Sequence, residues 1–184
     1  ILLPFTYKEI LSKKKEISNN LPLLLFLGLT SVGLFNSFVY VSLQYTQVIN
    51  ASLFNTAIPA AIILSCFIFK IEKTNFYQLL GLLISVFGIL VIITKFNLNI
   101  LLNLDFNIGD IWMIGAVICW GLYSSFLKKL KLKISLLSFV HIVCTCGLIF
   151  LLPQFSYEYF QGNAATIDKT FIYCLIYLAL FPSI

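Results

Sequence analysis

Long apolar stretches limit what this chain can fold into more than any other feature of the sequence. Five of them, each close to 20 residues, lie at 21–43, 48–69, 75–94, 110–127 and 134–152, and a sixth begins near residue 170. A helix needs about 20 residues to cross about 30 Å of hydrocarbon. Because no water is available there to pair the backbone, each stretch is expected to be a helix. The sequence therefore predicts an all-α polytopic membrane protein.

The composition excludes an ordinary soluble domain. The chain is 60% hydrophobic and 10% charged, whereas soluble domains carry about 25% charged residues. Its lysines form short clusters between the apolar stretches, so the expected partner is the lipid bilayer and nucleic acid is not expected. The five cysteines all lie within apolar stretches, where cysteine acts as a small hydrophobic residue. No nucleotide-binding, metal-binding or hydrolase motif is recognised, and no cofactor or metal is predicted.

The lysines predict the orientation of the helices. Three segments carry ten of the twelve lysines: the one before the first stretch, the one between the second and third, and the one between the fourth and fifth. Short lysine-rich loops stay on the cytoplasmic side of a membrane. Strict alternation of the helices puts all three on that side, so residues 21–43 should run outward and 48–69 inward. The expected location is the inner (plasma) membrane, with loops at 95–108 and 153–169 outside.

Small residues recur on one face of two of the expected helices. Because side chains of this size let helices approach closely in lipid, both faces are expected to be packing faces. Their residues are Ala57, Ala61 and Ser65 in one helix, and Gly81, Ser85 and Gly88 in the other.

Polar residues inside the apolar stretches mark a candidate substrate cavity. Such residues cost free energy in hydrocarbon unless they face a partner or water, so they should point into the bundle. Asn36 and Tyr40 lie one turn apart, as do Asn55 and Pro59. Proline frees a carbonyl near Asn55, and bent helices at mid-membrane often form substrate sites. A purely structural kink, with Asn55 bonded to a neighbouring helix, is the alternative.

Further candidates lie in the later helices and loops. Trp120, Tyr123 and Ser124 are candidates to line the same cavity, or they serve only in packing. His141, the only histidine, is a candidate proton relay because imidazole titrates near physiological pH; a hydrogen-bonded packing role is the alternative. Glu72 lies at the predicted cytoplasmic edge, as a gate or anchor or as a solvated loop charge.

Several loose motifs follow one another in a fixed order over nearly the whole chain. They lie in the stretches FNSFVYVSLQYTQVINASLFNTAIPAAIILSCFIFKIEK, FYQLLGLLISVFGILVI and GDIWMIGAVICWGLYSSFLKKL. This series resembles the EamA-like transporter family of the drug/metabolite transporter superfamily. Gly121 stands where the family usually has alanine, and lysines replace its paired arginines. The matching positions are Leu43, Tyr45, Thr46, Pro59, Glu72, Gln78, Gly81, Gly88, Ile89, Gly109, Asp110, Trp120, Tyr123, Lys128 and Lys129.

The resemblance implies a fragment of about six spans from a ten-helix bundle built of two inverted five-helix repeats. Residues 1–94 would be the C-terminal part of the first repeat, 95–108 an outer loop, and 109–184 the N-terminal part of the second. It implies a permease or exporter of small metabolites, such as amino acids and related compounds, that works by alternating access and is not an enzyme. A homodimer is an arrangement that the sequence leaves open.

Two other functions remain open at this point. A membrane-embedded enzyme would need clustered acids, and only Asp105 and Asp110 come close; Asp110, after Gly109, is otherwise expected to cap a helix. A non-transporting membrane scaffold or sensor is the second, and it predicts that Asn36 and Asn55 can be replaced without loss of function.

Overall fold

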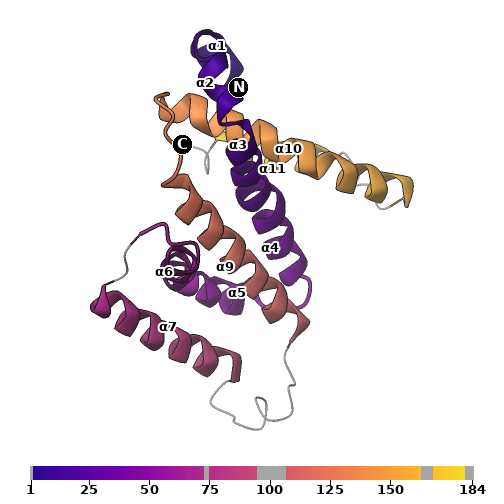
Figure 1. Ribbon diagram of the computed structural model, residues 1–184. Coiled ribbons are helices and arrows are strands. Elements are labelled where there is room, and N and C mark those ends of the chain that lie inside the picture. Colours follow the sequence, from indigo (N-terminus) through magenta and orange to yellow (C-terminus); the bar gives the residue numbers. More distant parts are fainter. Residues whose placement is uncertain (1, 73–74, 95–106, 163–167, 181–184) are drawn as a thin grey trace. The chain divides into compact units, whose positions relative to one another are not determined.

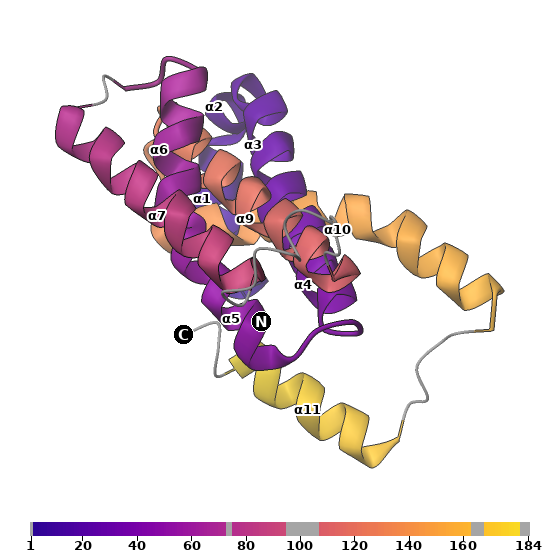
Figure 2. The same ribbon diagram turned by 90° about the horizontal axis from the view of Figure 1, so that it is seen from below.

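The computed structural model describes residues 2–72, 75–94, 107–162 and 168–180, and the fold over these residues is all-α (Figures 1 and 2). The helices are α1 (Leu3–Ser12), α2 (Lys14–Asn19), α3 (Leu21–Gly28), η1 (Leu29–Phe35), α4 (Asn36–Ser42), α5 (Val48–Phe54), η2 (Asn55–Ala57), α6 (Ile58–Ile68), α7 (Phe76–Thr94), α9 (Ile108–Leu127), α10 (Leu136–Phe160) and α11 (Lys169–Leu180). Here η1 is a π-helix and η2 a 3-10 helix.

Four helical segments of the described chain are long and apolar enough to cross a membrane: Leu21–Ser42, Ala51–Ile68, Ile108–Leu127 and Leu136–Phe160. They correspond to four of the predicted apolar stretches, and α7 corresponds to a fifth. The all-α prediction is confirmed. The chain divides into two compact units, residues 1–150 and 151–184.

Within the first unit, α9 is the central helix. It packs against α6 and α5 on one side and against α3, η1 and α4 on the other, and α7 runs alongside α5 and α6 (Figures 1 and 2). The second unit holds the C-terminal turns of α10, together with α11.

The predicted loop at 153–169 was placed too early. Pro153 lies inside α10, which continues to Phe160. Proline removes one backbone hydrogen bond, and apolar membrane helices tolerate this loss. Gly162, two residues beyond Phe160, has a φ of 77°, the left-handed conformation that follows many helix ends and favours glycine.

The three lysine-rich segments come together at one end of the first unit. Lys128, just after α9, forms an ion pair of 2.6 Å with Glu72, which follows α6. Glu9 of α1 accepts a hydrogen bond from the backbone N–H of Ser135 at 2.7 Å, and one from the Ser135 hydroxyl. This grouping is the one that strict alternation of the helices predicts.

At the opposite end, α4 meets the start of α9. The buried Ser42 hydroxyl donates to the Gly109 carbonyl at 2.7 Å. A Cβ on Gly109 would lie 2.9 Å from the Ser42 carbonyl oxygen, so this approach requires glycine. The expectation that Asp110 caps the helix was wrong: the Asn107 side chain accepts from the Gly109 N–H at 2.8 Å and is the cap, while Asp110 lies in the first turn.

Small residues set two close helix crossings. Ala57 and Ser65 are buried, and a Cβ on Gly121 of α9 would lie 2.7 Å from the Ala61 Cβ, which confirms this face of η2 and α6 as a packing face. The other crossing joins Gly28 of α3 to Gly147 of α10; a Cβ on Gly28 would lie 2.8 Å from the Gly147 nitrogen. The sequence did not single out this second pair.

The expected packing face on α7, at Gly81 and Gly88, makes no close helix contact among the described residues. No heavy atom of a described neighbouring residue lies within 4 Å of an ideal Cβ on Gly81 or Gly88. Within the described chain this face is therefore uncovered, and the expectation of close packing is not met there.

Candidate functional site

A row of aromatic rings joins α9 to the π-helix η1 and to α4. The ring centroids of Phe35 and Trp120 are 4.7 Å apart, and those of Trp120 and Tyr123 are 5.2 Å apart. Nearer the other end of α9, Phe38 meets Trp112 at 5.2 Å. Tilted aromatic pairs at these distances attract one another beyond their burial of apolar area. Trp120 and Tyr123 are therefore held in place by packing and are only partly buried.

The row lies directly beside the π-helix, which interrupts the first span in its middle. In a π-helix each carbonyl pairs with the N–H five residues later instead of four, and such turns are frequent at functional sites. The Asn36 side-chain amide donates to the carbonyls of Ser31 and Val32, at 3.2 Å each. Asn36 thus stabilises an irregular stretch of its own helix, and its side chain is partly buried.

The second span is also interrupted in its middle, at η2. Asn55 begins this 3-10 turn, and Pro59 lies in the first turn of α6. In a first turn the missing N–H of proline costs no hydrogen bond. Asn55 and Pro59 are both exposed among the described residues. The break falls where the sequence predicted one.

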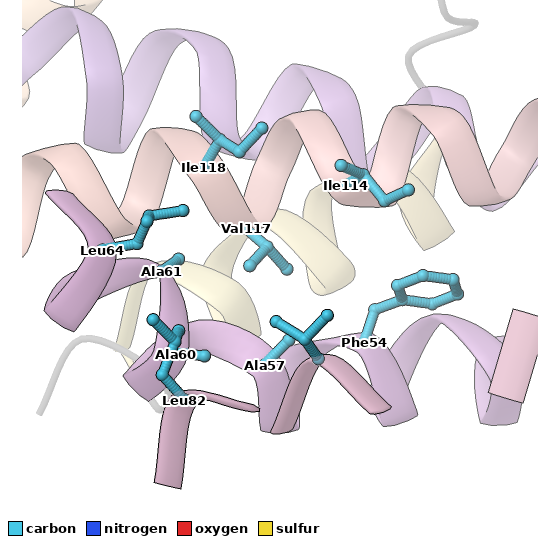
Figure 3. Close-up of a pocket in the computed structure, with 10 residues that line it drawn as sticks. Phe54, Ala57, Ala60, Ala61, Leu64, Leu82, Ile114, Val117 and Ile118 are labelled. Carbon is cyan, nitrogen blue, oxygen red and sulfur yellow. The ribbon is translucent and has the colours of Figure 1, made fainter. Parts of the chain in front are cut away.

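An apolar groove of about 310 Å³ lies between η2–α6, α7 and α9 (Figure 3). Every residue that lines it is aliphatic or phenylalanine, and none is a predicted cavity residue. The lining residues are Phe54, Ala57, Ala60, Ala61, Leu64, Leu82, Val86, Ile114, Val117 and Ile118.

His141 and Glu72 have partners at other places in the unit. The His141 Nδ1 lies 2.5 Å from the hydroxyl of Thr6, a fully buried residue of α1. That hydroxyl also donates to the Leu2 carbonyl at 3.1 Å. Glu72 pairs with Lys128, and their hydrogen bond raises the pKa of the Lys128 ammonium above its ordinary value. Both side chains of this ion pair remain about half exposed.

Comparison with known proteins identifies the family of this chain. The model of the EamA-like transporter family matches residues 1–94 and 107–184. The chain belongs to the EamA-like transporter family. With its apolar helices, it is a multi-pass membrane protein.

Two curated relatives are similar to this EamA-family chain. The uncharacterized transporter YyaM of Bacillus subtilis is 30% identical over 112 residues, which are 60% of the chain and 36% of the relative. An uncharacterized transporter of Archaeoglobus fulgidus is 28% identical over 159 residues, 86% of the chain and 53% of the relative. The chain thus spans between about a third and a half of the length of these relatives. No solved structure matches the chain.

The described helices do not gather the predicted site residues of this EamA-family chain into one cavity. Trp120 and Tyr123 come together beside Phe35 and the start of α4, and Ser124 is the next residue along α9. Tyr40 is 63% exposed. Asn55 and Pro59 belong to the helix pair that packs on the other side of α9.

The sequence interpretation missed three aromatic residues of the row, namely Phe35, Phe38 and Trp112. A spacing of three residues between Phe35 and Phe38 was visible, and it places both rings on one helix face. Their partners on α9 could not be named, because this depends on how two helices far apart in the sequence cross.

Proposed function

We propose that this chain is part of an inner-membrane permease that exports small metabolites, amino acids and related compounds among them, by alternating access. Membership of the EamA-like family and the similarity to two proteins named as transporters support the coarse function. The substrate class is proposed from the family resemblance, and the mechanism from the geometry below.

The observation that carries the proposal is that both spans flanking α9 are interrupted in their middle. One contains the π-helix Leu29–Phe35, and the other contains the 3-10 turn Asn55–Ala57. Irregular backbone at membrane depth is tolerated where it is buried in protein or lines a water-filled cavity, and transporters bind substrate at such points. Asn55, exposed at one interruption, is the residue we assign to the substrate path. Asn36, Tyr40, Trp120, Tyr123 and Ser124 do not share a cavity with Asn55 among the described residues; we assign them to a second wall of the path, beside the π-helix on the other side of α9.

The proposed repeat organisation divides the chain at the 95–108 loop, most of which lies outside the described residues. The family match in two segments, 1–94 and 107–184, supports this division. Alternating access then requires the two parts to rock against each other around a central site.

The Glu72–Lys128 ion pair is suited to a cytoplasmic gate in this scheme. It joins a loop of the first proposed repeat to a loop of the second, over 2.6 Å. Because both groups are about half exposed, the pair is weak and can open without a large cost. His141, against Thr6, is the proposed relay if export is coupled to protons.

The test uses the complete gene, expressed in cells that are challenged with a panel of toxic amino-acid and metabolite analogues. Wild type should confer resistance to one compound and lower its internal level. Asn55→Leu, made in equal amount, should not. Phe67→Leu is the matched control, since it changes an exposed apolar residue of the same span away from the break.

Two results would count against the proposal. If wild type leaves the internal level of every compound unchanged, export is wrong, and uptake, an enzyme or a scaffold becomes the better explanation. If wild type and Asn55→Leu export one compound equally well, the carboxamide has only a structural role.

A further inference from the structure

The groove between α6, α7 and α9 is lined only by apolar side chains. It measures about 310 Å³ and offers no polar side chain along its lining. Ala57 and Ala60 form a buried floor, with relative exposures of 3% and 5% (Figure 3). Binding sites for small polar molecules carry a few placed polar groups that fix orientation. A polar metabolite would lose its hydrogen bonds to water here and gain none, so the occupant should be a hydrocarbon.

The groove lies across the middle of the second span, since its lining there runs from Phe54 to Leu64 within the span Ala51–Ile68. Leu64 is four residues, or about 6 Å of helical rise, from the end of the span at Ile68. One leaflet of the hydrocarbon core is about 15 Å thick, so an acyl chain that enters from the lysine-rich leaflet would reach the groove with its inner part. A single acyl chain is narrow enough to lie along a groove of this volume.

Lysines follow the ends of two of the helices that line the groove. Six residues beyond Leu64, Lys70 follows the end of α6; it is exposed and has a φ of 49°. Lys128 and Lys129 follow the end of α9 at the same end of the unit, where Lys128 meets Glu72. Lys70 makes no salt bridge to an acidic residue in the described chain. Lysines at this depth attract the phosphate of anionic lipids.

We propose that this groove binds one acyl chain of an anionic phospholipid from the lysine-rich leaflet, with Lys70 next to the headgroup phosphate. The groove borders the proposed substrate path, because Ala57 of the 3-10 turn lines it, but Asn55 itself does not. The inference depends on the membrane location of the chain and not on what the protein transports.

The experiment is native mass spectrometry of the complete protein, stripped of lipid in detergent. The protein is then equilibrated with phosphatidylglycerol or with phosphatidylcholine of identical acyl chains. Wild type should retain one phosphatidylglycerol and less phosphatidylcholine. Val86→Phe fills the groove from a side chain that is 43% exposed, and Ala60→Leu fills it from the floor. Each should lower retention about tenfold, because added volume displaces the chain.

Matched variants separate the acyl chain from the headgroup. Gly81→Leu adds similar volume on α7 where no described neighbouring atom lies within 4 Å, and it should leave retention unchanged. Lys70→Gln should weaken retention of phosphatidylglycerol about fivefold, toward that of phosphatidylcholine.

Three results would overturn the proposal. Wild-type levels of lipid on folded Val86→Phe would show that the groove is not the site, even if Ala60→Leu failed to fold. Equal retention of both lipids by wild type would show that the site has no preference for an anionic headgroup. Retention of no lipid by wild type would show that nothing of this chemistry occupies the groove.

Discussion

Gly121 sets the distance between α6 and α9. A Cβ at this position would lie 2.7 Å from the Ala61 Cβ and 2.9 Å from its carbonyl carbon. The second contact is with backbone, which cannot rotate away. The next turn adds a hydrogen bond across the same crossing, from the Ser125 hydroxyl to the Ile62 carbonyl at 3.1 Å. Close packing and this bond therefore depend on the same missing side chain.

Gly121→Ala should lower the free energy of unfolding by about 1–3 kcal/mol, because the two helices must move apart. The control is Gly81→Ala, which meets no described neighbouring atom within 4 Å. Replacing a glycine within an exposed helix stabilises by about 0.5–1 kcal/mol. Thermal unfolding of the purified proteins measures both, and equal midpoints for the two variants would contradict the crossing.

Glu9 caps the start of α10 from another helix. Its carboxylate accepts hydrogen bonds from the Ser135 hydroxyl and backbone N–H and from the Ser138 hydroxyl, the last at 2.5 Å. A negative charge at the N-terminus of a helix is favourable. The hydrogen bonds from Ser135, and then the one from Ser138, hold the pKa of the Glu9 carboxyl below its ordinary value of 4.5.

This lowered pKa makes the stability of the contact depend on pH. The ionised form is favoured by folding, so its contribution is fully present above pH 4.5 and is lost as the pH falls through the lowered pKa. Glu9→Gln should lower the thermal midpoint at neutral pH, and the difference from wild type should shrink in acid. Glu16→Gln, which removes an exposed ion pair with Lys13, should change little at any pH. A difference for Glu9→Gln that stayed constant with pH would argue against the charged contact.

At the scale of the helices, sequence reasoning was right about length and about the break in the second span, but it missed the π-helix in the first. A continuous apolar stretch determines that a segment spans, because the length follows from bilayer thickness. Pro59 marked the break in the second span, since proline has a known effect on the backbone. No comparable residue marked the π-helix. Its side-chain bonds, such as Thr30 to the Phe26 carbonyl at 2.9 Å, are ones that regular helices also make.

Pro59→Ala separates a functional bend from a structural one. Alanine supplies an N–H that can bond the carbonyl four residues earlier, so α5, η2 and α6 can approach one continuous helix. The thermal midpoint should stay equal or rise, and export should fall. The two are measured on the same preparation and in the same cells as in the analogue assay. Unchanged export with a higher midpoint would make the bend a matter of packing only.

At the scale of the whole first unit, two contacts far apart in the sequence support one topology. Glu9 reaches Ser135, 126 residues later, and Glu72 reaches Lys128, 56 residues later. Together they place at one end the three segments that carry ten of the twelve lysines. The sequence predicted this grouping from charge alone, because alternation of spans requires it. It could not name the contacts, which depend on the crossing of α1 with α10 and on the packing of α6 against α9.

Side-specific labelling tests the membrane orientation that follows from this grouping. In a cysteine-free background, single cysteines at Lys15, Lys70 and Lys133 should react with a membrane-impermeant maleimide only in inside-out vesicles, because short lysine-rich loops remain in the cytoplasm. A cysteine at Thr46, beside the start of α9 at the opposite end of the unit, should react in intact cells. Labelling of all four sites from the same side would contradict the alternation of the spans. If the three lysine positions reacted in intact cells and Thr46 only in inside-out vesicles, the fold would be unchanged but the membrane orientation would be reversed. The Glu72–Lys128 pair would then lie on the outer face.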